Sequence, residues 1–267
     1  MLRDITLGQY YQTDSVLHRL DPRVKLAGTL LYIISLFFFR NFIGYLIAAV
    51  FLAMVIKLSH VPFKFMVKGM KAILFLLLIT VVFNLFLTPG ETLISVWRLT
   101  VTKEGLRTAV TMAVRLIMLV IGSSIMTLTT TPNNLTDGME RGMRPLKVFR
   151  VPVHEVAMMM SIALRFIPIL LEETDKIMKA QIARGADFES GNLIRRARAL
   201  VPLLVPLFIS AFRRANDLAM AMEARCYRGG EGRTKMKPLI YQKRDKTAYL
   251  CILAYLVVSI VLGRIRI

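Results

Sequence analysis

Apolar residues along this chain gather in long runs instead of alternating with polar ones. Five of these runs are long enough to cross a hydrocarbon layer about 30 Å thick, which takes roughly 17 to 25 helical residues. Between the fourth and fifth runs the pattern changes to segments that are apolar in one half and amphipathic in the other. We therefore predict about five transmembrane helices, at residues 24–39, 42–58, 72–88, 108–128 and 248–262.

The composition supports a membrane protein. Hydrophobic residues make up 55% of the 267 positions, charged residues only 20%, and the mean hydropathy is +0.57. A single soluble core cannot bury that much apolar surface. The predicted fold class is an all-α integral membrane protein.

The positive charge indicates which loops face the cytoplasm, because short loops rich in Lys and Arg stay on that side of a membrane. Residues 57–71, between the second and third predicted helices, contain four lysines and no acidic residue. The next loop, at 89–107, mixes charges of both signs and is expected outside. The N-terminus is then cytoplasmic.

Three parts follow from this topology. Residues 1–128 form an N-terminal membrane domain with four transmembrane helices, 129–246 a cytoplasmic domain, and 247–267 a C-terminal transmembrane helix. The middle part holds 21 of the 36 Lys and Arg and 12 of the 17 Asp and Glu, so it is a folded domain and not a basic tail. No nucleic-acid-binding motif accompanies the isoelectric point near 10.4, and we expect no nucleic-acid partner. Arg264 and Arg266 would lie outside, against the charge rule, which leaves the helix count open.

Two long segments dominate the middle part. Their apolar portions run only about 14 residues, a length more typical of a buried or interfacial helix than of a membrane crossing. Pro168, Pro202 and Pro206 are expected to bend these helices. Before them, Pro132 starts and Pro145 ends one more short helix.

Each long segment ends in the same pattern, Ala-x-x-Ala-Arg followed by a small residue. The two copies are Ala183-Arg184-Gly185 and Ala224-Arg225-Cys226, and glycines close behind them indicate helix C-termini. An arginine there can simply satisfy the last carbonyl groups of its own helix. Alternatively, the planar guanidinium can grip carboxylates or carbonyls of a protein partner, and two matched ends suggest two matched sockets.

The stretches "GQYYQTDSVLHRLDPRVKL" and "MMMSIALRFIP", with the paired "ARG" and "ARC", resemble the transmembrane T component of energy-coupling factor (ECF) transporters, the EcfT family. The likeness covers almost the whole chain. It implies that the two long helices are coupling helices, whose ends dock into two ABC-type ATPase subunits (A and A'), and that a substrate-binding S component sits beside them in a bacterial cell membrane. The second motif departs from the family pattern at Cys226, which puts a glycine-dependent turn there in doubt.

The resemblance also implies a non-catalytic subunit of a vitamin or micronutrient importer. No phosphate-binding loop of the G-x-x-x-x-G-K-[ST] type occurs, so ATP and Mg²⁺ are expected on partner chains, with no cofactor or metal site here. Two alternatives remain: the permease of a conventional ABC transporter, or a membrane phosphotransferase suggested by "TDGMERGMR". The latter pattern has Glu140 where Ala is required and lacks the metal-binding aspartates.

Two further residues have structural interpretations. Asp21-Pro22 fits an N-cap followed by proline at the first helical position. Arg115 lies in the fourth predicted membrane helix, where an unpaired charge is costly, so we expect an internal polar partner for it.

Overall fold

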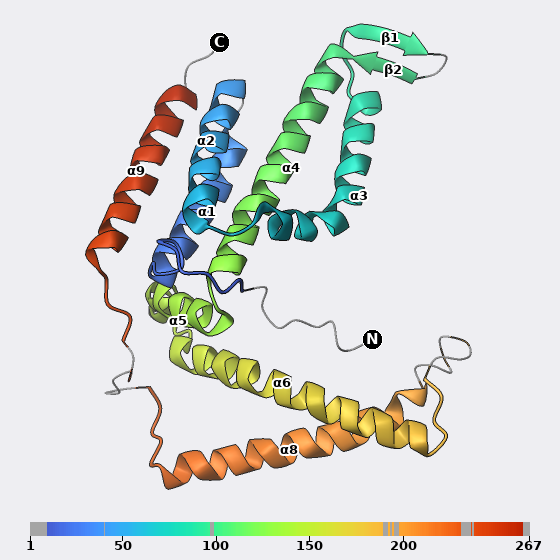
Figure 1. Cartoon of the computed structure of the whole chain (residues 1–267), viewed down its shortest axis with the longest axis vertical. Coiled ribbons are helices and arrows are strands. Elements are labelled where there is room, and N and C mark those ends of the chain that lie inside the picture. The colour runs from blue at the N-terminus through green and yellow to red at the C-terminus, as the bar shows by residue number, and fades with distance from the viewer. Residues whose placement is uncertain are drawn as a thin grey trace. The chain divides into compact units, whose positions relative to one another are not determined.

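The structure is a computed structural model that describes residues 10–39, 41–96, 99–188, 192, 194, 198–230, 236 and 238–263. It is almost entirely helical, which confirms the all-α membrane class (Figure 1). All five predicted membrane segments are helices. The helices are α1 (Pro22–Phe38), α2 (Phe42–Ser59), α3 (Phe63–Leu87), α4 (Lys103–Thr129), α5 (Pro132–Gly142), the short 3-10 helix η2 (Arg144–Phe149), α6 (Val153–Ala183), α8 (Val201–Ala224) and α9 (Lys243–Gly263).

The chain divides into two compact units. One unit consists of Gly8–Arg141 together with Leu239–Ile267, and the other contains Gly142–Pro238. We call the first the membrane unit and the second the α6–α8 unit. Compactness does not locate a bilayer, so the predicted boundaries at 128 and 246, and the cytoplasmic side of 129–246, stay predictions.

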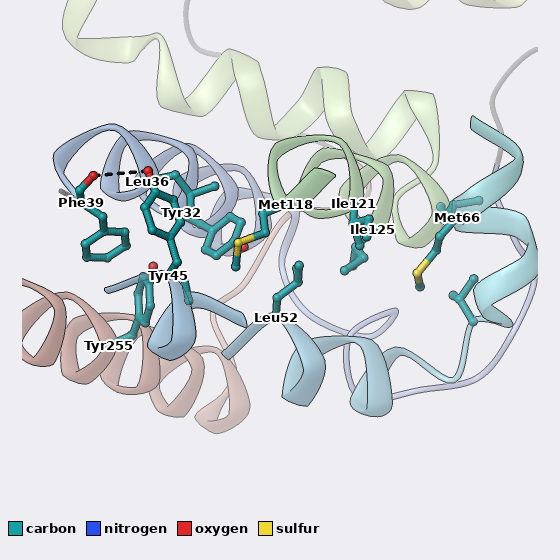
Figure 2. Close-up of a cluster of buried hydrophobic side chains, with 13 residues drawn as sticks. Tyr32, Leu36, Phe39, Tyr45, Leu52, Met66, Met118, Ile121, Ile125 and Tyr255 are labelled. Atoms are coloured by element: carbon teal, nitrogen blue, oxygen red, sulfur yellow. Dashed lines mark hydrogen bonds between the residues drawn. The ribbon is translucent and has the colours of Figure 1, made fainter. Parts of the chain in front are cut away.

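The membrane unit is organised around α4. This helix packs against α1, α2 and α3, while α9 packs against α1 and α2. Their buried side chains form one apolar cluster, in which Tyr32, Leu36, Leu52, Met118 and Tyr255 are nearly inaccessible (Figure 2). Outside this cluster, large apolar side chains are exposed along the same helices, as expected of surfaces that face lipid.

Three described helices are long and apolar enough to cross a membrane by length and composition alone: α2, α4 and α6. In α3, only Ile73–Leu87 is apolar, and this stretch is shorter. The result for α6 corrects the sequence argument from length, because this 31-residue helix contains an apolar stretch long enough to cross a membrane. The number of spans therefore stays a prediction.

A small β-hairpin, which the sequence analysis did not predict, connects α3 to α4. Strand β1 (Thr92–Val96) pairs antiparallel with β2 (Leu99–Thr102), with Thr92 opposite Thr102. The hydroxyl of Thr102 donates to the carbonyl of Thr88 at 2.8 Å and accepts from the backbone N–H of Gly105 at 3.0 Å, which caps α4. The hairpin thus sets the turn between two long helices.

In the α6–α8 unit, the two long helices pack against each other in opposite directions. Arg214 of α8 donates to Glu173 of α6 at 2.5 Å, and the side chain of Gln181 near the end of α6 contacts the Pro202 carbonyl at the start of α8. Both helices continue through their internal prolines, Pro168 and Pro206. Pro202 lies in the first turn of α8, where proline is tolerated, and the expected bend there stays a prediction.

Candidate docking site at two helix ends

Both Ala-Arg motifs are helix C-termini, as the sequence predicted. Ala183 is the last residue of α6 and Arg184 its C-cap; Ala224 is the last residue of α8 and Arg225 its C-cap. The two arginines have almost the same backbone conformation, with φ/ψ of −87°/5° and −91°/12°. We call these two segments the helix tips.

The first tip closes with a Schellman motif. The backbone N–H of Gly185 donates to the carbonyl of Ile182, and that of Ala186 donates to the carbonyl of Gln181, both at 2.9 Å. Gly185 has φ +88°, a left-handed conformation that glycine adopts without a steric penalty. A side-chain Cβ at this position would meet no atom within 4 Å, so backbone conformation and not space favours glycine here.

The second tip closes in the same way although it has no glycine at the turn. The N–H of Cys226 donates to the Glu223 carbonyl at 2.8 Å, and the N–H of Tyr227 to the Met222 carbonyl at 3.0 Å. Cys226 adopts φ +54°. A left-handed non-glycine residue costs roughly 1 to 2 kcal/mol, and two hydrogen bonds accompany it here. The doubt raised by Cys226 is therefore resolved: the turn is present without glycine.

These hydrogen bonds bear on what the arginines do. Within each tip, backbone N–H groups already bind two of the last four carbonyls of the helix, which leaves less for an arginine side chain to satisfy. The side chains of Arg184 and Arg225 are both exposed. Capping of their own helices is therefore a poor explanation for the repeated arginine, and the guanidinium groups are accessible to another molecule.

The two tips are far apart within the unit. The end of α6 contacts the start of α8, so the first tip lies at one end of α8 and the second at the other (Figure 1). At 1.5 Å per helical residue, the length of α8 separates them by about 35 Å. Two separate sockets are needed to hold both.

The helices between the tips expose apolar side chains. Met159 of α6 is 57% exposed and Phe208 of α8 is 61% exposed. Further exposed residues on α8 are Leu204, Val205, Ile209, Phe212 and Met220. Apolar patches of this kind mark surfaces that another protein or a membrane covers.

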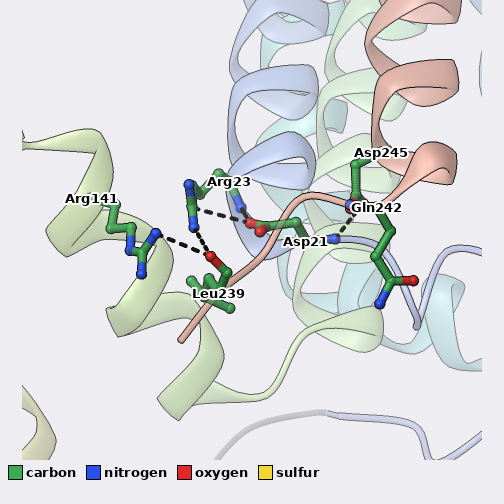
Figure 3. A network of polar contacts seen from close by, with 6 residues as sticks. All are labelled: Asp21, Arg23, Arg141, Leu239, Gln242 and Asp245. Carbon is green, nitrogen blue, oxygen red and sulfur yellow. Dashed lines mark hydrogen bonds and ion pairs between the residues drawn. The ribbon is translucent and has the colours of Figure 1, made fainter. Parts of the chain in front are cut away.

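A polar network that the sequence analysis missed lies in the membrane unit, centred on Asp245 in the first turn of α9 (Figure 3). This residue is only 2% exposed. One of its carboxyl oxygens accepts from the backbone N–H of Asp21 at 2.9 Å, and the other accepts from the N–H of Gln242 at 2.7 Å. Since Asp21 is the N-cap of α1 and Gln242 immediately precedes α9, a single side chain holds the starts of two helices.

The same network holds the point where the chain re-enters the membrane unit. The carbonyl of Leu239 accepts from Arg23 of α1 at 2.9 Å and from Arg141, at the end of α5, at 3.1 Å. The chain leaves this unit after Arg141 and returns at Leu239. Both crossing points are therefore fastened to each other and to α1. We call Asp21, Arg23, Arg141, Leu239 and Asp245 the crossing network.

The two structural interpretations from the sequence are confirmed. The side chain of Asp21 accepts from the backbone N–H of Arg23 at 2.9 Å, with Pro22 opening α1. Arg115 finds its polar partner within the membrane unit: its Nε and Nη2 donate to the hydroxyl of Tyr45 at 2.9 and 2.6 Å. Among the described residues, no group of three or more His, Cys, Asp and Glu side chains could hold a metal ion.

Comparison with known proteins gives consistent matches along the chain. A family model described as CbiQ, a cobalt transport protein, matches residues 13–236, which include both helix tips. The energy-coupling factor transporter transmembrane protein EcfT of Clostridium kluyveri is 56% identical over 262 residues, covering 97% of each chain. The EcfT proteins of Thermosediminibacter oceani and Bacillus subtilis are 54% and 45% identical, covering 93% and 95% of this chain and 94% and 96% of their own.

Proposed function

Because the chain belongs to the CbiQ/EcfT family of transporter transmembrane proteins, we propose that it couples two cytosolic ATPase subunits to a separate substrate-binding membrane subunit. The observation that carries this proposal is the pair of helix tips, which share one backbone geometry and each expose one arginine. Each tip docks in one ABC-type ATPase. The site residues are Ala183, Arg184, Gly185, Ala224, Arg225 and Cys226.

In this proposal, the two arginines form the main contacts with the ATPase subunits. A guanidinium group presents five N–H donors in a planar fork, which suits carboxylates and carbonyls at the bottom of a protein groove. The alanine and the small residue beside each arginine let the backbone of the tip approach such a groove closely. The Schellman turn ends the helix abruptly and leaves the arginine at its extreme end.

Motion of the two ATPases would reach the membrane through α6 and α8. These helices are held to each other by the Glu173–Arg214 ion pair, so moving the tips moves the pair. Transfer of a conformational change requires such contiguous packed elements with two arrangements. The exposed apolar surface around Met159 and Phe208 is where we place the substrate-binding subunit.

ATP and Mg²⁺ bind to the ATPase partners, and this chain is non-catalytic and needs no cofactor. It is a multi-pass protein of the bacterial cell membrane, with the N-terminus and the α6–α8 unit cytoplasmic. The cargo is a vitamin or another micronutrient, and the substrate-binding subunit selects it.

Copurification tests the assembly directly. The tagged full chain, extracted in mild detergent from its own host, should bring down two ATPase chains and a small membrane protein in fixed proportion. Mass spectrometry identifies them. A chain that purifies without any ATPase from membranes containing the partners would contradict the proposal.

Cysteine labelling tests the orientation. In a background lacking Cys226 and Cys251, a cysteine at Ser95 in the hairpin should react with an impermeant maleimide on intact cells. A cysteine at Lys64, in the lysine-rich first turns of α3, should react only after the cells are opened. Labelling at 64 and not at 95 would reverse the topology.

A further inference from the structure

The membrane unit contains an apolar crevice that no docking role uses. Its volume is about 440 Å³, within the range of sites that hold a small ligand. The walls come from α1, α2, α4 and α9, together with the segment that precedes α1; Val24, Leu52, Ile125 and Ile252 are among the lining side chains. We call it the α1–α9 crevice.

Two cationic side chains line this otherwise apolar space. Lys25 lies in the first turn or so of α1 and Arg244 in the first turn of α9. The starts of these two helices are joined by the hydrogen bond from Asp21 to Asp245, so both cations are at the same end of the unit. Among the lining residues that the structure describes, none is acidic. The crevice thus combines an apolar body with a positively charged end.

The side chain of Lys25 is positioned by backbone carbonyls and not by a direct ion pair among the described residues. Its ammonium group donates to the carbonyls of Thr129 at 2.8 Å and His18 at 3.3 Å, which uses two of its three N–H groups. Asp21 and Asp245 attract Lys25 electrostatically, but their carboxyl oxygens bind other groups: Asp21 binds Arg23, and Asp245 binds two backbone N–H groups. Among the described residues, no ion pair forms to Lys25.

Arg244 is similarly available to an anion. It is half-buried and donates to the neutral side-chain amide oxygen of Gln242 at 2.8 Å through Nε. A guanidinium has five N–H donors and suits a phosphate group especially well. Both cations therefore retain N–H donors at the end of the apolar space.

We propose that the α1–α9 crevice binds one anionic phospholipid, with an acyl chain along the apolar walls and the phosphate between Lys25 and Arg244. Basic pockets between transmembrane helices on the cytoplasmic side are known to bind anionic lipid headgroups. The leaflet follows from the orientation proposed above, because α1 and α9 both begin on the cytoplasmic side. The binding itself does not depend on ATPase docking, so the two proposals can fail separately.

Native mass spectrometry provides the test. The purified full chain is equilibrated with phosphatidylglycerol and phosphatidylcholine of identical acyl chains in equal amounts, and the lipids that survive collisional activation are counted. We expect one retained phosphatidylglycerol and severalfold less phosphatidylcholine. Lys25→Gln with Arg244→Gln should remove this preference, and Arg244→Gln alone should weaken it in a chain that keeps every Lys25 contact.

Matched variants distinguish lipid binding in the crevice from nonspecific electrostatic attraction of lipid to the protein. Lys246→Gln, an exposed position two residues from Arg244, should leave lipid retention unchanged. Ala248→Trp should fill the crevice and remove the retained lipid with both cations intact. Equal retention of the two lipids by the natural chain, or equal loss in the Lys246 and Arg244 variants, would overturn the proposal.

Cys251 lines the crevice. Its reactivity can therefore show whether a lipid or another protein occupies this space. In a Cys226→Ser background, phosphatidylglycerol should slow its reaction with a small maleimide more than phosphatidylcholine does. Protection that requires the substrate-binding subunit, and does not respond to lipid, would assign the crevice to that protein and refute the lipid site.

Discussion

The double substitution Arg184→Ala with Arg225→Ala is expected to release both ATPases from the detergent-purified complex, while the chain stays folded in the membrane. Removing one side of a buried, hydrogen-bonded charged contact costs about 2 to 5 kcal/mol, whereas loss of an exposed helix-end charge costs under about 1 kcal/mol. The tips should survive, since their closing hydrogen bonds involve backbone atoms only. Size-exclusion chromatography of the tagged complex and substrate uptake measure the result.

Three control variants distinguish loss of the docking arginines from general loss of charge or of the helix turn. Arg228→Ala removes an exposed arginine just beyond the second motif and should leave the ATPases bound. Arg→Lys at the two motif positions should restore binding only in part, because lysine lacks the planar fork. Cys226→Gly should bind normally, since glycine adopts the left-handed turn readily. Normal ATPase retention and transport by the double alanine variant would leave the arginines as helix-end residues without a docking role.

Asp245→Ala should be the most destabilising single change in the crossing network. It removes a 2% exposed carboxyl group and leaves the backbone N–H groups of Asp21 and Gln242 without their acceptor. A buried donor without a partner, as at Asp21, costs about 1 to 3 kcal/mol, and the partly exposed N–H of Gln242 adds less, so a total of roughly 2 to 4 kcal/mol is expected. Thermal unfolding of the full chain in detergent should show a clearly lower midpoint.

The neighbouring position supplies the comparison. Lys246→Ala changes an exposed residue of the same helix turn and should shift the midpoint very little. Asp245→Asn keeps one acceptor oxygen and should fall between the two. If the Asp245→Ala chain has the same unfolding midpoint as the natural chain, the starts of α1 and α9 are held by apolar packing alone.

Features encoded by nearby residues could be predicted from the sequence. The five long apolar helices follow from run length, and the start of α1 follows from Asp21-Pro22. The ends of α6 and α8 follow from the Ala-Arg motifs with glycines behind them. Each of these signals lies within a few residues of the structure it specifies. The predicted loop at 57–71 is wrong in extent, because α3 begins at Phe63 and includes most of that stretch.

Features that depend on distant residues or on cooperative turns could not be predicted. Asp21 and Asp245 are 224 positions apart, and nothing local to either reveals the hydrogen bond between them. The left-handed Cys226 is favoured by two backbone hydrogen bonds that close the tip, against its own side-chain preference. The hairpin at Thr92–Thr102 is too short to give a clear alternating pattern.

The crossing network makes the α6–α8 unit an insertion within the membrane unit. The chain leaves after Arg141 and returns at Leu239, and a hydrogen bond of 3.1 Å joins these two residues. A segment whose two ends are neighbours can be lengthened, shortened or exchanged without stretching the domain that hosts it. If the proposed docking role holds, recombination at these two positions would join one membrane unit to the helix tips of another transporter, so residues 142–238 could be exchanged as one module.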